Sequence, residues 1–571
     1  MEGALSPNNC MRISSLKRLR FILTTVFLFG GKVYIERLRL LYLVPWRSRV
    51  HGFLHQRGSA EPLVLLQGQQ KIVSPPVLRE LLETLGPTFV KLGQILSLRP
   101  DFVGEELSRE LSRLQSNVTP FPYEQVERII VEELGGQPGQ VFSVFDRRPI
   151  AAASLAQVHH AFLEDGTEVA VKVQRPGIRE TIEQDIDILL YLARLTEKFI
   201  PETRPYNPVQ VIREFADWTR RELDFAVEGH NAERFRYVFR DNRHIKIPVI
   251  HWPFTTPRVL TMEYVDGVRA DDLAGIEQRG IDRKRLALHG VDAQLQQILI
   301  DGFFHADPHP GNSFALEGDV LCFYDFGMVG YLNENQRREL ISCFVAFANR
   351  NMEVFLKHFL HLARVSAESE VTGFQKDASA ILNEMFFSPT SPSIAWIFFR
   401  LINRGAERRI GFPADLALFS KALITTEAMG LTLYPDFDFN DHMAPFVRKA
   451  FEAYIDPARL RRSVANDFID FAALVWDLPE RIHTTLKRLE EREGAGVKLD
   501  PQALVIIQKE LRRQTDRRVA EIALLAVAFL TAVMVFTRAK AVLSSYAVTG
   551  LALGFFLALF VFFLIRARRK E

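Results

Sequence analysis

The sequence predicts an α+β protein in which a small β-rich lobe precedes a large helical lobe, with a membrane-spanning helical hairpin at the end. Short β-type runs cluster between residues 141 and 264, where apolar residues alternate or lie together. Helical periodicity fills residues 283–299 and most of 335–508, and two long charge-free stretches follow. The 25% of charged residues are too many for a polytopic transporter and too ordinary for a disordered protein.

The charge balance argues against a nucleic-acid-binding protein, and the cysteines argue against a disulfide-rich or zinc-stabilised one. Lys plus Arg total 71 and Asp plus Glu total 69, which leaves a formal net charge of +2. This balance gives no basic footprint, so we expect no nucleic-acid partner. The three cysteines, Cys10, Cys322 and Cys343, are too scattered for a disulfide framework, and no Cys/His cluster in the sequence predicts structural zinc.

Residues 1–75 form a basic N-terminal region. A short apolar stretch at residues 21–31 follows three basic residues, but no small-residue cleavage site comes after it, which argues against a signal peptide. The next residues continue the pattern of a basic amphipathic helix. Two interpretations stay open: a helix that lies on a membrane surface, or an ordinary packed helix with a solvated basic face.

The charge-free stretches at residues 522–537 and 541–565 predict two transmembrane helices, which form a hairpin over 516–566. The second stretch exceeds the ~20 residues that cross a bilayer, and the first is marginal. Eight basic residues flank the hairpin on its outer sides and two lie in its loop, so we expect the main body on the cytoplasmic side. No clear organelle-targeting segment is present, which favours a bacterial plasma (inner) membrane.

The strongest chemical signal is an Asp-x-x-x-x-Asn loop followed by Asp-Phe-Gly. Phosphoryl transfer needs a carboxylate that orients or deprotonates the acceptor, and oxygen ligands that hold Mg²⁺ against the nucleotide phosphates. Asp307 is the candidate catalytic carboxylate, and Asn312 and Asp325 are the candidate metal ligands. In this order and at this spacing, the three groups predict a site for ATP or ADP with Mg²⁺.

Upstream, the strand Glu-Val-Ala-Val-Lys172 matches the kinase strand whose lysine binds the α- and β-phosphates. The loop before it is rich in alanine where a glycine-rich phosphate loop is expected. A Cβ at each position restricts the backbone and keeps the loop further from the phosphates, so we expect nucleotide to bind with altered phosphate geometry. The candidate nucleotide contacts in this loop are Ala151, Ala152, Ala153, Ser154 and Val158.

The motifs together resemble the UbiB/ABC1/ADCK (AarF) family of atypical protein-kinase-like proteins, and the C-terminal hairpin is similar to that of its bacterial UbiB members. The resemblance rests on the Lys91-x-Gly-Gln94 motif, the AAASLAQVH loop and the Glu222-x-Asp224 motif. It implies a bilobal kinase-like fold. The expected domains are the N-terminal region 1–75, a helical extension 76–135, an N-lobe with an inserted helix 136–265, a helical C-lobe 266–515 and the hairpin 516–566.

The resemblance also implies roles for single residues. Lys91 and Gln94 would lie in the nucleotide cleft, with Lys91 in a catalytic role and Gln94 near the nucleotide. Spacing alone leaves Glu183 and Glu222 open as the charge partner of Lys172; the family pattern favours Glu222. Asp224 would then lie near the metal or Lys91. The strand that ends near Tyr264 would lead to a hinge at which Glu263 and Val265 offer backbone groups to adenine.

Two departures from ordinary protein kinases bear on the substrate. Ala306 precedes Asp307 where an arginine would pair with a phosphorylated activation loop, and no APE-type segment follows Gly327. The missing platform argues against a peptide substrate. The family resemblance implies an atypical kinase or ATPase that supports ubiquinone biosynthesis and acts on, or is controlled by, a membrane lipid or quinone precursor. The alternatives are a nucleotide-sensing scaffold for quinone-biosynthesis enzymes and a conventional protein kinase. The sequence does not indicate the oligomeric state.

Overall fold

The computed structural model describes residues 13–455, apart from short gaps and the longer stretch 49–73. Nearly all of these residues belong to one compact unit, Met1–Tyr454. The two charge-free stretches near the C-terminus lie outside the described residues, so the transmembrane hairpin stays a prediction.

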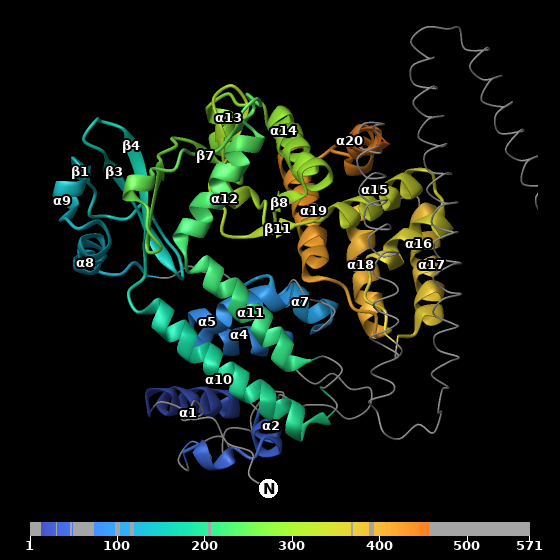
Figure 1. Ribbon diagram of the computed structural model, residues 1–571, viewed down its shortest axis with the longest axis horizontal. Coiled ribbons are helices and arrows are strands. Elements are labelled where there is room, and N and C mark those ends of the chain that lie inside the picture. Colours follow the sequence, from blue (N-terminus) through green and yellow to red (C-terminus); the bar gives the residue numbers. More distant parts are fainter. Residues whose placement is uncertain are drawn as a thin grey trace, which may run out of the picture. The chain divides into compact units, whose positions relative to one another are not determined.

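The small lobe is built on a five-stranded antiparallel sheet (Figure 1). Its strand order is β1-β3-β4-β6, and β2 pairs with β3. Strand β4 alternates as predicted: Val169, Val171 and Val173 are fully buried, while Lys172 lies on the opposite face. The strands are β1 (Val144–Phe145), β2 (Ala151–Ala152), β3 (Ala156–Phe162), β4 (Glu168–Gln174) and β6 (Val259–Glu263). Short helices α8 (Tyr123–Leu134) and α9 (Pro138–Val141) precede them.

A layer of helices lies beside this sheet and joins the N-terminal region to the inserted helices (Figure 1). Its N-terminal members are α1 (Ile13–Leu28), α2 (Lys32–Arg37), α4 (Pro75–Leu85), α5 (Pro87–Ser97) and α7 (Glu105–Leu111). They share one apolar cluster with α10 (Ile178–Phe199) and α11 (Pro208–Glu222). Helix α12 (Phe225–Val238) follows α11 directly and packs on the sheet.

One ion pair fixes α1 in this layer. The Arg18 guanidinium donates to both carboxylate oxygens of Asp185 on α10, at 2.7 and 2.8 Å, and to the carbonyl oxygen of Leu85 at 2.9 Å. The Asp185 side chain is fully buried. Leu19 and Ile22 are buried on the same side of α1, so the described part of the N-terminal region is a packed helix.

The large lobe is mainly helical and carries two small sheets. Strands β7 (Val268–Arg269), β9 (Ser313–Leu316) and β10 (Val320–Phe323) form one sheet with β5 (Ile245–Lys246), and β8 (Phe303–His305) pairs with β11 (Val329–Tyr331). The helices are α13 (Leu273–Gln278), α14 (Arg283–Gln296), α15 (Glu334–Ala348), α16 (Met352–His361), α17 (Val371–Phe387), α18 (Ile394–Glu407), α19 (Ala414–Leu433) and α20 (Phe439–Ile455).

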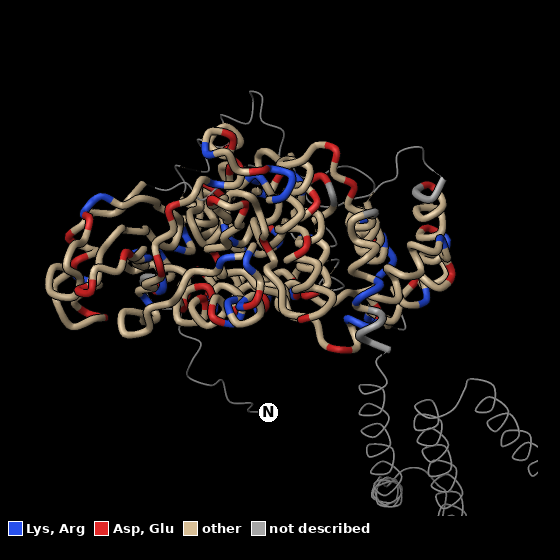
Figure 2. The backbone as a smooth tube through the Cα atoms, turned by 90° about the horizontal axis from the view of Figure 1, so that it is seen from above, with Lys and Arg blue, Asp and Glu red and all other residues tan. Residues whose placement is uncertain are grey.

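Helix α19 is the one helix in the described part of the chain that is long and apolar enough to cross a membrane. Leu416, Phe419 and Leu423 are buried in the main cluster of the large lobe, so α19 is a core helix of this lobe. Around the core, Figure 2 shows Lys and Arg interspersed with Asp and Glu along the described chain. This mixture agrees with the near-zero net charge.

We expect Arg18→Met to destabilise the described unit, because it leaves the buried Asp185 carboxylate without its cation. Removing one partner of a buried pair costs about 3–5 kcal/mol, and thermal unfolding of the full-length protein measures it. Lys32→Met is the matched control, since Lys32 and Glu36 form a looser pair at 3.7 Å that is about two-fifths exposed. Equal shifts in melting temperature for the two variants would contradict the assignment.

Candidate functional site

The charge partner of Lys172 is Glu228, which corrects the sequence prediction. The Lys172 ammonium donates to both Glu228 carboxylate oxygens, at 2.8 Å each. Neither predicted partner makes this contact: Glu222 pairs with Lys91, and Glu183 pairs with Arg220 on the surface at 2.7 Å. The physical reason is the break between α11 and α12: Glu222 ends α11, whereas Glu228 lies in the first turn of the helix that packs on the sheet.

The sequence did contain a signal for Glu228. Phe225, Glu228, Gly229, Ala232 and Phe235 recur at helical spacing, and all of them are buried. A glutamate within an otherwise apolar helix face needs a cationic partner, and the strand lysine is the one that the fold supplies. The number of residues between Lys172 and Glu228 could not reveal the pair, because the inserted helices α10 and α11 lie between the strand and α12.

Burial and nearby charges set the protonation of the pair. Burial favours neutral Lys172, but the carboxylates of Glu228 and Asp325 outweigh it and raise the pKa of Lys172. Burial also raises the pKa of Glu228, against the attraction of Lys172. Lys172 is therefore a fixed cation at the centre of the site.

The Asp-Phe-Gly segment lies against α12. The Phe326 ring is buried and packs on Phe235 of α12, with ring centroids 5.4 Å apart, and the Asn231 amide donates to the Phe326 carbonyl oxygen at 3.1 Å. Burial would raise the pKa of Asp325, but Lys172 and the backbone N–H of Gly327 outweigh it and lower that pKa. Asp325 is thus held as a carboxylate close to Lys172.

The loop that carries Asp307 and Asn312 follows β8. Hydrogen bonds between side chains and backbone atoms of the same segment hold it in place. His305 is buried, burial lowers its pKa, and its Nδ1 accepts a hydrogen bond from the Asp307 backbone N–H at 3.0 Å. The Asn312 amide nitrogen donates to the Asp307 carbonyl oxygen at 3.2 Å. Because that nitrogen is engaged, the Asn312 side-chain oxygen is the atom left to bind a cation.

A cation that sequence reasoning missed lies beside Asp307. Lys421 of α19 places its ammonium 2.9 Å from Asp307 Oδ1, and both side chains are partly exposed. Lys421 is more than a hundred residues away in the chain and belongs to no motif of the loop. Only the packing of α19 in the large lobe brings it there.

The helical extension reaches the site through Lys91 of α5. The Lys91 ammonium donates to Glu222 at the end of α11, and Lys91 is buried. Gly93 lets α5 pack closely against its own neighbours in the extension, because a Cβ there would lie 2.3 Å from a Leu114 methyl group. The Gln94 amide donates to the Leu114 carbonyl oxygen at 3.2 Å, within the extension itself. The nucleotide contact expected for Gln94 stays a prediction.

The alanine-rich loop forms a tight β-hairpin in the place of a phosphate loop. Ala151 pairs with Val158 and Ala152 with Gln157 across β2 and β3, and the Ala153 N–H donates to the Ala156 carbonyl oxygen at 2.7 Å. Ser154 lies in the turn. Val158 in turn lies opposite Lys172 on β4, so the hairpin stands beside the lysine that the phosphates would meet.

Asp224 and Glu263, two further residues of the predicted site, make contacts that stabilise the fold. One Asp224 oxygen caps α12 by accepting the Ala226 N–H at 3.1 Å. Glu263 ends β6, and its carboxylate pairs with Lys246 at 2.5 Å, while its N–H donates to the Val249 carbonyl oxygen. Val265 follows outside the strand. The metal role of Asp224 and the adenine contacts at Glu263 and Val265 stay predictions.

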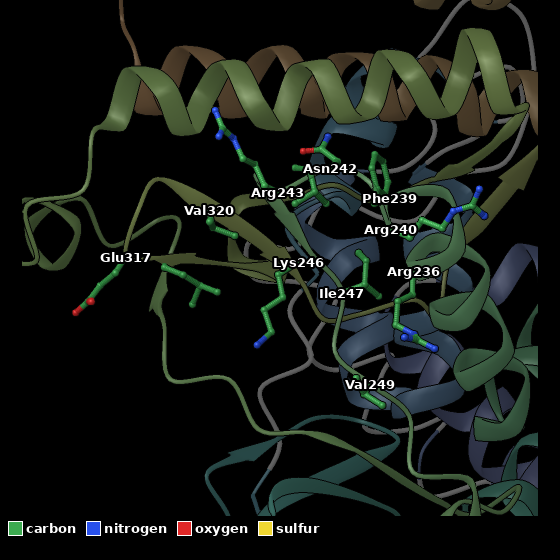
Figure 3. A pocket seen from close by; sticks show the side chains of 12 residues that line it. Arg236, Phe239, Arg240, Asn242, Arg243, Lys246, Ile247, Val249, Glu317 and Val320 are labelled. Carbon is green, nitrogen blue, oxygen red and sulfur yellow. The ribbon is translucent and has the colours of Figure 1, made fainter.

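A separate cavity of about 550 Å³ is lined by residues of α12, β5 and the β9–β10 hairpin. Its basic residues are Arg236, Arg240, Arg243 and Lys246, and Ile247 is among its apolar residues. Figure 3 shows the charged ends of these four side chains pointing in different directions, so they do not converge on one anion. The cavity includes none of the predicted site residues.

The sheet, the lysine–glutamate pair of β4 and α12, and the loop that holds Asp307 define the class of protein-kinase-like proteins. Within this class the chain belongs to the ABC1 atypical kinase-like family, whose domain profile matches residues 113–359. The family resemblance predicted from the motifs is thereby confirmed, as is the α+β kinase-like fold of the described residues.

Three similar proteins each match between 65% and 85% of the chain. The chain is 32% identical over 500 residues to a probable protein kinase UbiB of Marinobacter nauticus, with 85% of this chain and 91% of that protein covered. It is 33% identical over 453 residues to a protein of the same name from Pseudomonas fluorescens, with 78% and 82% covered. A chloroplast protein of Arabidopsis thaliana, ACTIVITY OF BC1 COMPLEX KINASE 8, is 35% identical over 403 residues, with 65% and 53% covered.

We expect Glu228→Gln to destabilise the protein and weaken nucleotide binding, because it leaves a buried lysine without its closest carboxylate. Asp325 compensates in part, so the stability cost lies near the lower end for a broken buried pair, about 3 kcal/mol. Glu183→Gln serves as the control and should behave like the wild type. Thermal unfolding and Mg-ATP titration distinguish the two glutamates; a larger effect of the Glu183 variant would refute the pairing.

Proposed function

We propose that this protein is a membrane-anchored atypical kinase or ATPase that binds ATP or ADP with Mg²⁺ and supports ubiquinone biosynthesis. The observation that carries the proposal is the buried Lys172–Glu228 pair next to Asp325, because this arrangement fixes a cation for the nucleotide phosphates. The family membership and the UbiB names of the relatives support the link to quinone biosynthesis.

The donor set suits Mg²⁺. Asn312 offers its side-chain oxygen and Asp325 an ionised carboxylate, and Mg²⁺ prefers oxygen ligands. These two residues would hold the ion, with Asp224 as a further candidate. The bound ion would neutralise charge on the nucleotide phosphates, while Lys172 orients them and Asp307 orients the acceptor.

A lipid-like acceptor or regulator fits the surroundings better than a peptide. The chain passes from Gly327 through the short strand β11 into α15 at Glu334, which leaves no room for a peptide-seating segment. The outer face of α1 also exposes Leu16, Phe21 and Leu28 beside Lys17 and Arg20. An exposed apolar face with basic residues suits a membrane surface, and the predicted hairpin would place the body at the cytoplasmic face of the bacterial plasma membrane.

Lys421 has a part in this proposal as the cation beside Asp307. The catalytic loop supplies no lysine or arginine of its own. With a nucleotide in place, the Lys421 ammonium would offset the charge that develops where phosphate and acceptor meet. In the absence of a nucleotide it neutralises Asp307 instead.

The second candidate function is a nucleotide-sensing scaffold that assembles quinone-biosynthesis enzymes. It is favoured by two contacts that occupy site residues: Lys91 with Glu222, and Lys421 with Asp307. In a scaffold these pairs would report nucleotide binding to partner proteins without turnover.

The proposal is tested with the full-length protein and three variants. Asp325→Asn should weaken Mg-nucleotide binding by about 10–100-fold, because it removes a charged metal ligand. Asp307→Asn should keep binding, lose ATPase activity and fail to complement a deletion strain. Unchanged binding and ATPase activity in Asp325→Asn would refute the proposal. Normal complementation by Asp307→Asn, together with failure of Lys172→Met, would instead support the scaffold.

We expect Lys421→Met to lower ATPase turnover by about 10²-fold while Mg-ATP affinity changes little, since the lysine acts where charge develops. Lys421→Arg should restore part of the activity, because the cation remains. Steady-state kinetics separate turnover from KM, and a variant with raised KM and normal turnover would contradict this role.

A further inference from the structure

Three groups of metal-ligand type converge between α15 and α16, apart from the catalytic loop and the Asp-Phe-Gly segment. Glu339 Oε2 lies 2.7 Å from Nδ1 of His358 and 3.2 Å from Nδ1 of His361. One ligand atom from each of the three residues lies within 4.8 Å of the others. The two histidines are three apart on α16 and therefore share one face of that helix.

The hydrophobic core fixes this cluster. Cys343 and Phe344 of α15 are buried against Phe355 and Phe359 of α16, and all four belong to the main cluster of the large lobe. This packing holds Glu339 opposite the histidine face of α16. The Glu339 side chain is 14% exposed, His358 is 26% exposed and His361 is 53% exposed, so the cluster opens to solvent on the His361 side.

The geometry suits one small ion. In a tetrahedral zinc site with ligand bonds near 2.0–2.1 Å, neighbouring ligand atoms lie roughly 3.3 Å apart. The 3.2 Å distance from Glu339 Oε2 to His361 matches this value, and the 2.7 Å hydrogen bond to His358 would lengthen by about 0.6 Å when an ion lies between the two atoms. Arg338 lies 3.6 Å from the other oxygen, Oε1, and leaves Oε2 to the histidines.

His160 is a useful comparison, because a metal site requires ligand atoms that face one common point. His160 also contacts two carboxylates, Asp146 through Nδ1 at 3.1 Å and Glu168 through Nε2 at 2.6 Å. Its two nitrogens point to opposite sides of the ring, so these groups cannot surround a single ion. Among the residues that the structure describes, only the Glu339 cluster brings the imidazole nitrogens of two histidines to one carboxylate oxygen.

We propose that Glu339, His358 and His361 bind a Zn²⁺ ion that joins α15 to α16, with water in the fourth position. Two imidazole nitrogens and one carboxylate select zinc over Mg²⁺ or Ca²⁺, which prefer oxygen ligands. The site is distinct from the proposed Mg²⁺ site in its residues and in its metal.

The test is zinc binding by the full-length protein after chelator treatment, measured by competition with a chromophoric chelator and by the melting temperature. One Zn²⁺ per chain should bind and raise the melting temperature. His361→Ala and Glu339→Gln should each weaken zinc binding at least about tenfold. His361 is half exposed, so its replacement should leave the melting temperature of the metal-free protein unchanged.

Two control variants make the result decisive. His160→Ala should bind zinc like the wild type, because its contacts cannot surround one ion. Asp325→Asn should also bind it normally, because zinc does not depend on the Mg²⁺ ligands. The proposal is overturned if no zinc binds, if all variants bind it alike, or if only Asp325→Asn loses it.

Discussion

The buried contact between Lys172 and Glu228 is the interaction on which the site depends. It joins the central strand of the small lobe to α12, and α12 in turn holds the Asp-Phe-Gly segment through Asn231 and Phe235. A buried ion pair contributes little net stability, but losing one partner is costly, so the pair acts mainly to fix geometry. The position of Asp325 follows from that geometry.

The helical extension is coupled to the same frame. Lys91 contacts Glu222, and Glu222 ends α11 only two residues before Asp224 caps α12. Helix α5 is thereby linked through α11 to the helix that carries Glu228. The close approach at Gly93 shows that the extension packs tightly against its own neighbours.

The sequence predicted what depends on local pattern and missed what depends on packing. The strand that carries Lys172 was predicted because Val169, Val171 and Val173 recur at every second position, and the loop of Asp307 and Asn312 was recognised by the spacing of these two residues. The prediction of Glu222 as the partner of Lys172 was wrong, because the inserted helices α10 and α11 lie between β4 and the actual partner, Glu228. Lys421 was missed because only the packing of α19, more than a hundred residues away in the chain, brings it to Asp307. The Glu339 cluster was missed because only the packing of α15 against α16 brings Glu339 to the two histidines.

The contact between Arg18 and Asp185 has a consequence for synthesis. The two residues are 167 positions apart, so at ribosomal speed α1 emerges on the order of ten seconds before α10 can receive it. Helices α2 and α4, which also pack on α1, are made earlier and cover part of its apolar face. Arg18, by contrast, has no Asp185 carboxylate to pair with until α10 has been made.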